Sequence, residues 1–240
     1  MSRRNRNPVT ARRGPSLNLI LTAVVVVLAV AVLGGVLLTN RSAADGTSAA
    51  LRPPGSHTLS QSTDDKVTVV EFLDFQCPAC VAYHTNITRQ LEQDYQDRFT
   101  FVPRHFPLDM HPLAVPAARA AEAAGRQGRY REMHHALYDG FDSWAVTEDG
   151  RSTSADLARA TAAFERFASQ VGLDLDRFRA DLSSPKVQAA IDQGRADGRR
   201  LGVTSTPTFF VNGVRFQPQA TSIADIDREL RALIDRELAG

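Results

Sequence analysis

The chain has 240 residues, with 28 basic and 27 acidic side chains, a net charge of +1 and a hydrophobic content of 43%. Its length is enough for one ordinary domain plus additional segments. The nearly balanced charge gives no sign of the basic surface that nucleic-acid binding requires, so we expect no nucleic-acid partner.

The first predicted element is an apolar segment over residues 17–38, whose only polar residues are Asn18 and Thr22. At about 1.5 Å per residue, a helix of this length crosses a hydrocarbon core of about 30 Å. Arginines are concentrated in residues 1–16, which the positive-inside rule places in the cytoplasm. We therefore predict a single-pass transmembrane helix in the cell membrane, with the rest of the chain outside the cytoplasm.

A cleaved signal peptide is the alternative for this segment. The apolar core of a signal peptide is about 7–15 residues long and ends at a small-x-small site. Here the core is longer, and the first such site, Ser42-Ala43-Ala44, follows a polar segment. The uncleaved anchor is the favoured interpretation, and both interpretations place the domain where disulfides can persist.

A flexible linker is predicted over residues 39–62, which are rich in serine, alanine, glycine and proline. The folded domain is predicted over 63–240. It begins with an apolar strand at 66–75, as expected for a central strand covered on both faces. A helix at 78–97 with proline in its first turn and an aromatic-rich strand at 99–106 follow.

The middle of the chain predicts a helical insertion at about 108–202. Its expected helices lie at 116–137, with a break near Gly125 and Gly128, and at 154–171, 174–182 and 185–201. Asn212-Gly213 between apolar runs then predicts a β-hairpin, and residues 222–238 an amphipathic helix. The order predicts an α/β fold, a central mixed sheet flanked by helices.

Both cysteines of the chain lie in Cys77-Pro78-Ala79-Cys80. A disulfide across two residues closes too small a loop to stabilise a fold by much, so we predict that this one is made and broken. Cys77 lies at the start of the predicted helix, where free N–H groups and the helix dipole favour a thiolate. We predict that Cys77 is the exposed nucleophile and Cys80 the less exposed resolving thiol.

The alternatives for the cysteine pair are a permanent structural disulfide and a metal site. A zinc site needs two more ligands, and no cysteine is left to supply them. We therefore expect no metal and no organic cofactor. The possible histidine ligands are His84, His105 and His111, and their spacing is not typical of a metal site. In the insertion, His134, His135 and Trp144 are interpreted as packing or surface residues.

Three segments together resemble the DsbA-like thioredoxin-fold thiol-disulfide oxidoreductases. They are the active-site segment Glu71-Phe72-Leu73-Asp74-Phe75-Gln76-Cys77-Pro78-Ala79-Cys80, the stretch Arg104-His105-Phe106-Pro107-Leu108 with His111 and Pro112, and the loop Gly202-Val203-Thr204-Ser205-Thr206-Pro207-Thr208-Phe209. The resemblance implies a thioredoxin fold over about residues 63–240. It also implies a cis Thr206-Pro207 bond that faces the cysteines. The expected substrate-binding residues are Thr206 and Pro207, whose loop holds the substrate backbone in the family, together with Pro78 and Ala79.

Glu71 lies six residues before Cys77, where thioredoxin-like proteins often have a buried acid. Burial would raise its pKa, and Glu71 could then exchange a proton with Cys80 as the disulfide opens or closes. The alternative is a glutamate paired with an arginine or with water at the end of the sheet.

Two residues bear on the direction of electron flow. Ala79 stands where the most oxidising relatives have histidine, so Cys77 lacks an adjacent cation; the helix dipole alone would give the thiol a pKa of about 7. Thr206 stands where isomerases and reductases often have threonine and strong oxidases often have valine. Both predict a milder oxidant.

The resemblance implies an extracytoplasmic enzyme of the cell envelope that exchanges its disulfide with cysteines of exported proteins, most simply as a dithiol oxidase. A quinone-linked membrane protein, DsbB-like or vitamin K epoxide reductase-like, would reoxidise the pair. The alternatives are a disulfide reductase or isomerase of the same fold and a non-catalytic chaperone or binding module.

Overall fold

The computed structural model describes residues 47–240. The predicted cytoplasmic segment 1–16, the transmembrane helix 17–38 and the first part of the linker lie outside these residues. Within the described part of the chain, no helix is both long enough and apolar enough to cross a bilayer.

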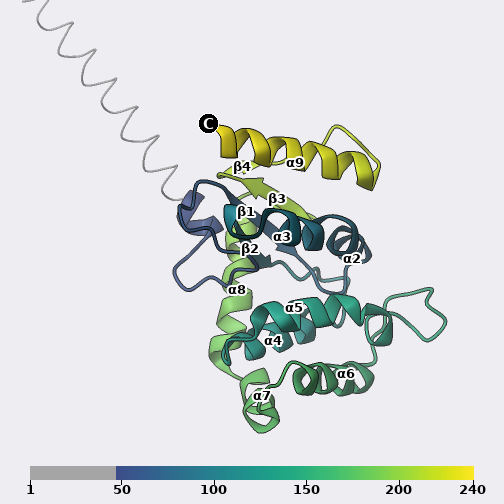
Figure 1. Cartoon of the computed structure of the whole chain (residues 1–240). Helices are drawn as coiled ribbons and strands as arrows, with labels where there is room; N and C mark the ends of the chain where they lie inside the picture. The colour runs from purple at the N-terminus through teal and green to yellow at the C-terminus, as the bar shows by residue number, and fades with distance from the viewer. Residues whose placement is uncertain (1–46) are drawn as a thin grey trace, which may run out of the picture. The chain divides into compact units, whose positions relative to one another are not determined.

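A mixed sheet with the strand order β2-β1-β3-β4 forms the centre of the domain (Figure 1). Its strands are β1 (Thr68–Leu73), β2 (Thr100–His105), β3 (Thr208–Val211) and β4 (Val214–Arg215). β1 is parallel to β2 and antiparallel to β3. The predicted apolar central strand is confirmed, because every residue of β1 except the first is buried.

Successive β1 side chains enter two different cores, as the period of two in a strand requires. Val69 and Leu73 belong to the larger apolar cluster, which also contains residues of the helices on that face. Val70 and Phe72 belong to the smaller cluster on the other face. Glu71 alternates with Val70 and Phe72, so it shares the face of the larger core and is buried there.

The predicted helix at 78–97 is interrupted by a π-helical segment. It consists of α2 (Pro78–Tyr83), the π-helix η1 (His84–Thr88), α3 (Arg89–Tyr95) and the 3₁₀ turn η2 (Gln96–Arg98). π-Helical segments are rare and are often found at functional sites. This change of helical geometry begins one turn after Cys80.

The helical insertion is present as a block that α8 connects to the sheet (Figure 1). Its elements are α4 (Ala114–Gly125), α5 (Tyr130–Asp139), η3 (Phe141–Ser143), α6 (Leu157–Gln170), α7 (Leu175–Leu182) and α8 (Pro185–Arg200). The predicted break between the first two helices is confirmed, with Gly128 at a positive φ of 73°. Gly194 of α8 lies so close to the His105 backbone of β2 that a Cβ would overlap it.

The C-terminal hairpin and helix are also confirmed. Asn212 and Gly213 both have positive φ, at 47° and 83°, as a tight hairpin turn requires. The helix α9 (Ile223–Ala239) buries Ile226, Leu230 and Ile234 in the larger core.

The prediction of a flexible linker up to residue 62 is wrong for its described part. Residues 47–51 are helical, and Leu51 and Leu59 are buried. The Leu59 N–H donates to the Phe101 carbonyl at 2.8 Å, and the Phe101 N–H donates to the Ser60 carbonyl at 2.9 Å. This segment therefore forms a short antiparallel bridge with the free edge of β2. The bridge gives hydrogen bonds to the strand edge, and the segment buries the two leucine side chains.

Candidate active site

The redox motif occupies the turn from β1 into α2. Cys77 is the N-cap residue of α2 with an extended backbone, and Pro78 occupies the first helical turn. The Cys77 N–H donates to the Asp74 carbonyl at 3.1 Å, and the Cys77 carbonyl accepts from the Val81 N–H at 3.2 Å. The sulfur of Cys77 thus lies at a helix N-terminus, where backbone N–H groups are free to stabilise a thiolate.

The two thiols differ in exposure, but less than predicted. Both cysteines are free thiols, Cys77 with 6% of its surface exposed and Cys80 with none. The prediction of an exposed Cys77 is therefore wrong in degree, because the loop before β3 covers it: the Cys77 Sγ lies 3.5 Å from the Thr206 carbonyl oxygen. The neighbours Pro78 and Ala79 are exposed, so this side of the motif faces solvent.

The pKa values of the two thiols move in opposite directions. A hydrogen bond from Cys80 makes the largest contribution to lowering the pKa of Cys77 to about 6; burial opposes it, and the Thr206 side chain and the backbone N–H groups of Cys80 and Ala79 assist. Burial, and then Cys77 itself, raise the pKa of Cys80 above its usual value. The pair is thus built to hold its negative charge on Cys77.

Glu71 is confirmed as a buried acid with a raised pKa. Burial, and to a lesser extent Glu92 and Cys77, raise the pKa of Glu71 to about 8. Its carboxylate has no ion-pair or hydrogen-bond partner in residues 47–240, which disagrees with the alternative of a glutamate paired with arginine. Glu71 in turn contributes to the raised pKa of Cys80, so the two groups interact electrostatically.

The Thr206-Pro207 peptide bond is cis, as the resemblance implied. Thr206 is buried beside Cys77, with its carbonyl oxygen 3.5 Å from the Cys77 sulfur. Pro207 is half-buried and lines a surface groove with Tyr83 and Phe216. Of the predicted substrate-binding residues, Pro78 and Ala79 therefore lie on the exposed side of the motif. Thr206 and Pro207 lie in the loop that covers Cys77.

Sequence reasoning missed two polar anchors of the redox turn, Asp74 and Gln76. Asp74 accepts hydrogen bonds from the N–H groups of Gln76 and Leu108 and pairs with His111 Nδ1 at 2.6 Å. Its hydrogen bond raises the pKa of His111 against the effect of burial. The Cys77 charge also acts to raise this pKa, so His111 and Cys77 interact electrostatically. Two polar residues just before the motif, at the end of an apolar strand, were the available signal.

Gln76 fixes the same turn to the insertion. Its side-chain oxygen accepts from the Leu113 N–H at 2.6 Å. Its side-chain amide donates to the carbonyls of Ala145 and Ser154 at 2.9 and 2.7 Å. The insertion therefore holds the redox turn through three hydrogen bonds of one buried side chain.

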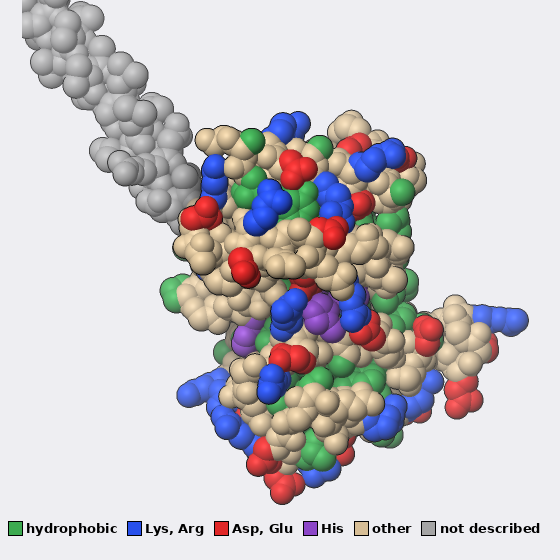
Figure 2. All heavy atoms as spheres, in the orientation of Figure 1, with side chains coloured by type: hydrophobic (Ala, Val, Ile, Leu, Met, Phe, Trp, Pro, Cys, Tyr) green, Lys and Arg blue, Asp and Glu red, His purple; other side chains and the backbone are tan. Residues whose placement is uncertain are grey.

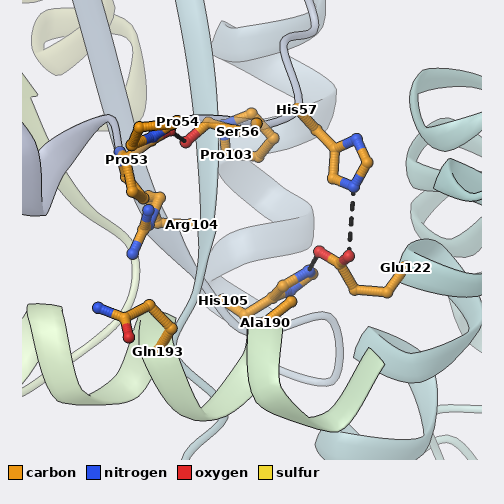
Figure 3. A pocket seen from close by; sticks show the side chains of 11 residues that line it. Pro53, Pro54, Ser56, His57, Pro103, Arg104, His105, Glu122, Ala190 and Gln193 are labelled. Atoms are coloured by element: carbon orange, nitrogen blue, oxygen red, sulfur yellow. Dashed lines mark hydrogen bonds and ion pairs between the residues drawn. The ribbon is translucent and has the colours of Figure 1, made fainter. Parts of the chain in front are cut away.

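A second polar site lies around Glu122, in a pocket that part of the predicted linker helps to line (Figure 3). Glu122 Oε2 pairs with His57 Nε2 at 3.2 Å, and Glu122 Oε1 pairs with His105 Nε2 at 2.8 Å. Burial acts to raise the pKa of Glu122, but the two histidines lower it to about 2. No cysteine lines this pocket, so we interpret its charges as a structural clamp.

Comparisons with known proteins agree with the fold. A profile of the thioredoxin family (Thioredoxin_4) matches residues 62–236. A thioredoxin-like oxidoreductase from Silicibacter pomeroyi DSS-3 is 28% identical, with a TM-score of 0.60 over 80% of this chain and 98% of that one. Wolbachia pipientis alpha-DsbA1 is 20% identical, with a TM-score of 0.65 over 81% and 96%. BdbD from Bacillus subtilis is 19% identical, with a TM-score of 0.63 over 78% and 94%.

Longer curated proteins share part of the sequence. Na⁺/H⁺ antiporter NhaA 3 from Salinispora tropica is 41% identical over 150 residues, which are 62% of this chain and 20% of the antiporter. NhaA 1 from Salinispora arenicola is 42% identical over 151 residues, with the same coverage. The chain thus spans about a fifth of the length of these relatives.

The family profile covers the mixed sheet, the redox turn and the cis-proline loop. The thiol pair at the N-terminus of α2 supplies the reacting groups that thiol–disulfide exchange requires. The chain belongs to the thioredoxin family, and its fold is that of the DsbA and BdbD structures.

Proposed function

We propose that this protein is a thiol–disulfide oxidoreductase that works outside the cytoplasm as a dithiol oxidase, passing the Cys77–Cys80 disulfide to cysteines of exported proteins. The unequal thiols are the observation that supports this direction. A thiolate that is stabilised on Cys77, with its pKa lowered to about 6, favours the reduced form of the enzyme. An enzyme with a stabilised reduced form gives up its disulfide more readily, by about 30 mV for each 1.4 kcal/mol.

The reaction begins with the oxidised enzyme. A substrate thiolate attacks Sγ of Cys77, the Cys77–Cys80 bond breaks, and the electron pair leaves on Cys80. A second substrate thiolate attacks the substrate sulfur of the mixed disulfide, and Cys77 leaves as a thiolate. The substrate has lost two electrons and gained a disulfide, and the enzyme holds both thiols in reduced form.

Glu71 has a role in the first step of this reaction. Cys80 leaves as a thiolate in a buried site that raises its pKa, so it must be protonated. With a pKa raised to about 8, Glu71 is mostly protonated near neutral pH and would supply that proton, directly or through water. In the reverse direction the same carboxylate would accept the proton from Cys80.

Substrate binding falls to the groups around the Cys77 sulfur. The loop of Thr206 and Pro207 covers one side, and the exposed Pro78 and Ala79 border the other. An extended substrate segment lying between them would bring its cysteine to Cys77. Reoxidation by a quinone-linked membrane protein, and anchoring through residues 17–38, complete the proposal.

The reductase or isomerase direction is the second candidate, and Ala79 favours it. No cation stands beside Cys77 at this position, so its thiolate depends on hydrogen bonds alone. Equilibration of the full chain with glutathione buffers separates the two directions: a potential above about −150 mV supports the oxidase, and one near −270 mV supports the reductase. A Cys77→Ser variant that keeps all its cellular function would instead support a non-catalytic binding module.

A further inference from the structure

Three histidines come together where the π-helical segment η1, which follows α2, contacts α5 of the helical insertion. His84 begins the π-helical η1, and His134 and His135 are neighbours in α5. One ring nitrogen of each lies within 4.8 Å of the others. The ring centres form a nearly equilateral triangle, with sides of 5.3, 5.4 and 5.5 Å.

These distances suit three imidazoles around one metal ion. With zinc–nitrogen bonds of about 2.0–2.1 Å in tetrahedral geometry, ring centres lie about 5.2 Å apart and the ligating nitrogens about 3.4 Å apart. The ring centres already have this spacing. The nitrogens, which lie within 4.8 Å of one another, would have to approach further as the ion binds.

Five ring nitrogens of this cluster lack a hydrogen bond within residues 47–240, and a charged group beside the first histidine, Asp139 Oδ1, lies 3.9 Å from His84 Nε2. Both ring nitrogens of His84 and of His134, and Nδ1 of His135, are buried without a hydrogen bond in the described part of the chain. Buried polar atoms in folded proteins are almost always satisfied, so five such nitrogens in one place call for an explanation. Packing against Tyr138 and Phe75 accounts for the ring faces but leaves the nitrogens unpaired.

The surroundings keep these rings in the form that binds metals. Burial, and then the neighbouring His135, lower the pKa of His84 to about 3, and burial lowers the pKa of His134. Both side chains are therefore neutral at physiological pH, and neutral imidazole is a metal ligand. The Arg89 and Asp139 charges also act on His84 from the rim of the cluster.

An outer group orients one of the rings. Glu92 Oε2 lies 3.3 Å from His135 Nε2, and the Arg131 guanidinium holds the same carboxylate at 3.1 Å. A carboxylate behind a histidine fixes its tautomer and turns its other nitrogen toward the metal, which here is the unpartnered Nδ1. The His135 side chain is 19% exposed, so one edge of the cluster borders solvent. Figure 2 shows histidine side chains (purple) beside arginines (blue) on one face of the domain.

We propose that His84, His134 and His135 form a binding site for a divalent transition-metal ion of the zinc class. Three neutral imidazoles without a thiolate or a carboxylate in the inner shell favour such an ion over calcium or magnesium, which prefer oxygen ligands. A water molecule would take the fourth position. The ion would join the π-helical segment that begins four residues after Cys80 to α5 of the insertion, and so hold the redox helix against it.

The test is a Zn²⁺ titration of the full chain in detergent, after oxidation to the Cys77–Cys80 disulfide so that no thiol can bind the metal. We expect one equivalent to bind, and the Tm to rise by roughly 5 °C when free Zn²⁺ exceeds the Kd about 100-fold. Co²⁺ in place of Zn²⁺ should give the visible absorption of a four-coordinate nitrogen site.

Variants locate the site. His135→Ala should weaken Zn²⁺ binding at least 10-fold, and Glu92→Gln, which keeps the volume of the side chain, by about 10-fold or more. His57→Ala is the matched control, because His57 is a half-buried histidine outside the cluster, and its Zn²⁺ affinity should not change. Circular dichroism of the metal-free variants checks that they fold. No saturable binding by the oxidised protein, or equal binding by His135→Ala and the parent, would overturn the proposal, whatever the direction of disulfide exchange.

Discussion

Glu71 and Glu122 are both glutamates inside the domain, and their pKa values move in opposite directions. The pKa of Glu71 is raised to about 8, first by burial, and that of Glu122 is lowered to about 2 despite burial. The difference lies in their partners. Glu122 has a histidine on each carboxylate oxygen, while Glu71 has no ion-pair partner in the described residues and lies near two thiols.

This comparison separates a reactive site from a structural one within the same fold. A buried charge with partners is held in one protonation state and fastens the elements that carry it. A buried acid without partners can gain or lose a proton near neutral pH, which is what a thiol pair of unequal pKa needs. The redox turn and the Glu122 pocket should therefore respond differently to substitution.

The largest expected effect is the loss of chemistry in Cys77→Ser. Without the attacking sulfur no mixed disulfide forms, so oxidation of a dithiol peptide should fall at least 1,000-fold, to the uncatalysed rate. Cys80→Ser is the paired variant and should accumulate a mixed disulfide on Cys77. Residual disulfide exchange by Cys77→Ser would show that Cys77 is not the attacking thiol and that the redox turn is not the reactive site.

Glu71→Gln tests the unpaired acid, first through stability. The folded-state pKa of Glu71 is raised, so ionisation costs folding free energy that grows as the pH rises above about 4.5 and stops growing above about 8. The variant should be more stable than the parent by about 1–3 kcal/mol at pH 7 and equal to it below about pH 4. Urea unfolding across this pH range measures the difference, and a destabilised variant at pH 7 would contradict it.

The same variant tests the proton transfer. Loss of a positioned acid should slow disulfide exchange by about 10- to 100-fold and remove the pH dependence near pH 8. Glu122→Gln serves as the control, because it changes a buried glutamate outside the redox turn and should leave the exchange rate within about twofold. Equal rates for Glu71→Gln and the parent would restrict Glu71 to a passive role.

Glu122→Gln should act on stability with the opposite sign. The folded-state pKa is depressed, so the ionised carboxylate stabilises the fold above its unfolded pKa of about 4.5, and this stabilisation is lost as the pH falls toward 2. The variant should lose about 2 kcal/mol at pH 7, a value reduced for the partial exposure of the pair, and its stability should change less than the parent's between pH 5 and 3. Urea midpoints at pH 7, 5 and 3 check this.

Ala79→His should have the smallest effect on the reaction. It places a histidine beside the charged Cys77, as histidines stand beside Glu122. A cation beside Cys77 should lower its pKa by about one unit, or 1.4 kcal/mol, and raise the potential by about 30 mV. Thiolate absorbance against pH measures the first and glutathione equilibration the second. A parent Cys77 with a pKa near 3.5 would contradict the lowering to about 6 found here and leave the histidine little to add.

Much of the domain was predictable because its signals are local. The apolar strand before the cysteines, Pro78 in the first turn of α2 and the Asn212-Gly213 turn each depend on neighbouring residues, and all are confirmed. The N-caps Asp174 and Ser184 are local as well, since each accepts a backbone N–H of its own helix. The cis Thr206-Pro207 bond was reached only through the resemblance.

Other features depend on contacts between distant segments. Leu59 was read as linker because its partner, the edge of β2, lies some forty residues away. The limited exposure of Cys77 depends on Thr206, and the hydrogen bonds of Gln76 depend on Ala145 and Ser154. A local sequence pattern does not show which residues far apart in the chain come into contact.

The sequence by itself determined the residue types that can react, the helix start that carries them and the order of strands and helices, because these follow from backbone geometry and short-range hydrogen bonds. Only the tertiary structure decided which buried groups are charged. Glu71 and Glu122 are the same residue type, and what distinguishes them is whether folding brings a partner within hydrogen-bond distance. Burial without a partner disfavours the charged form, and burial with one preserves it.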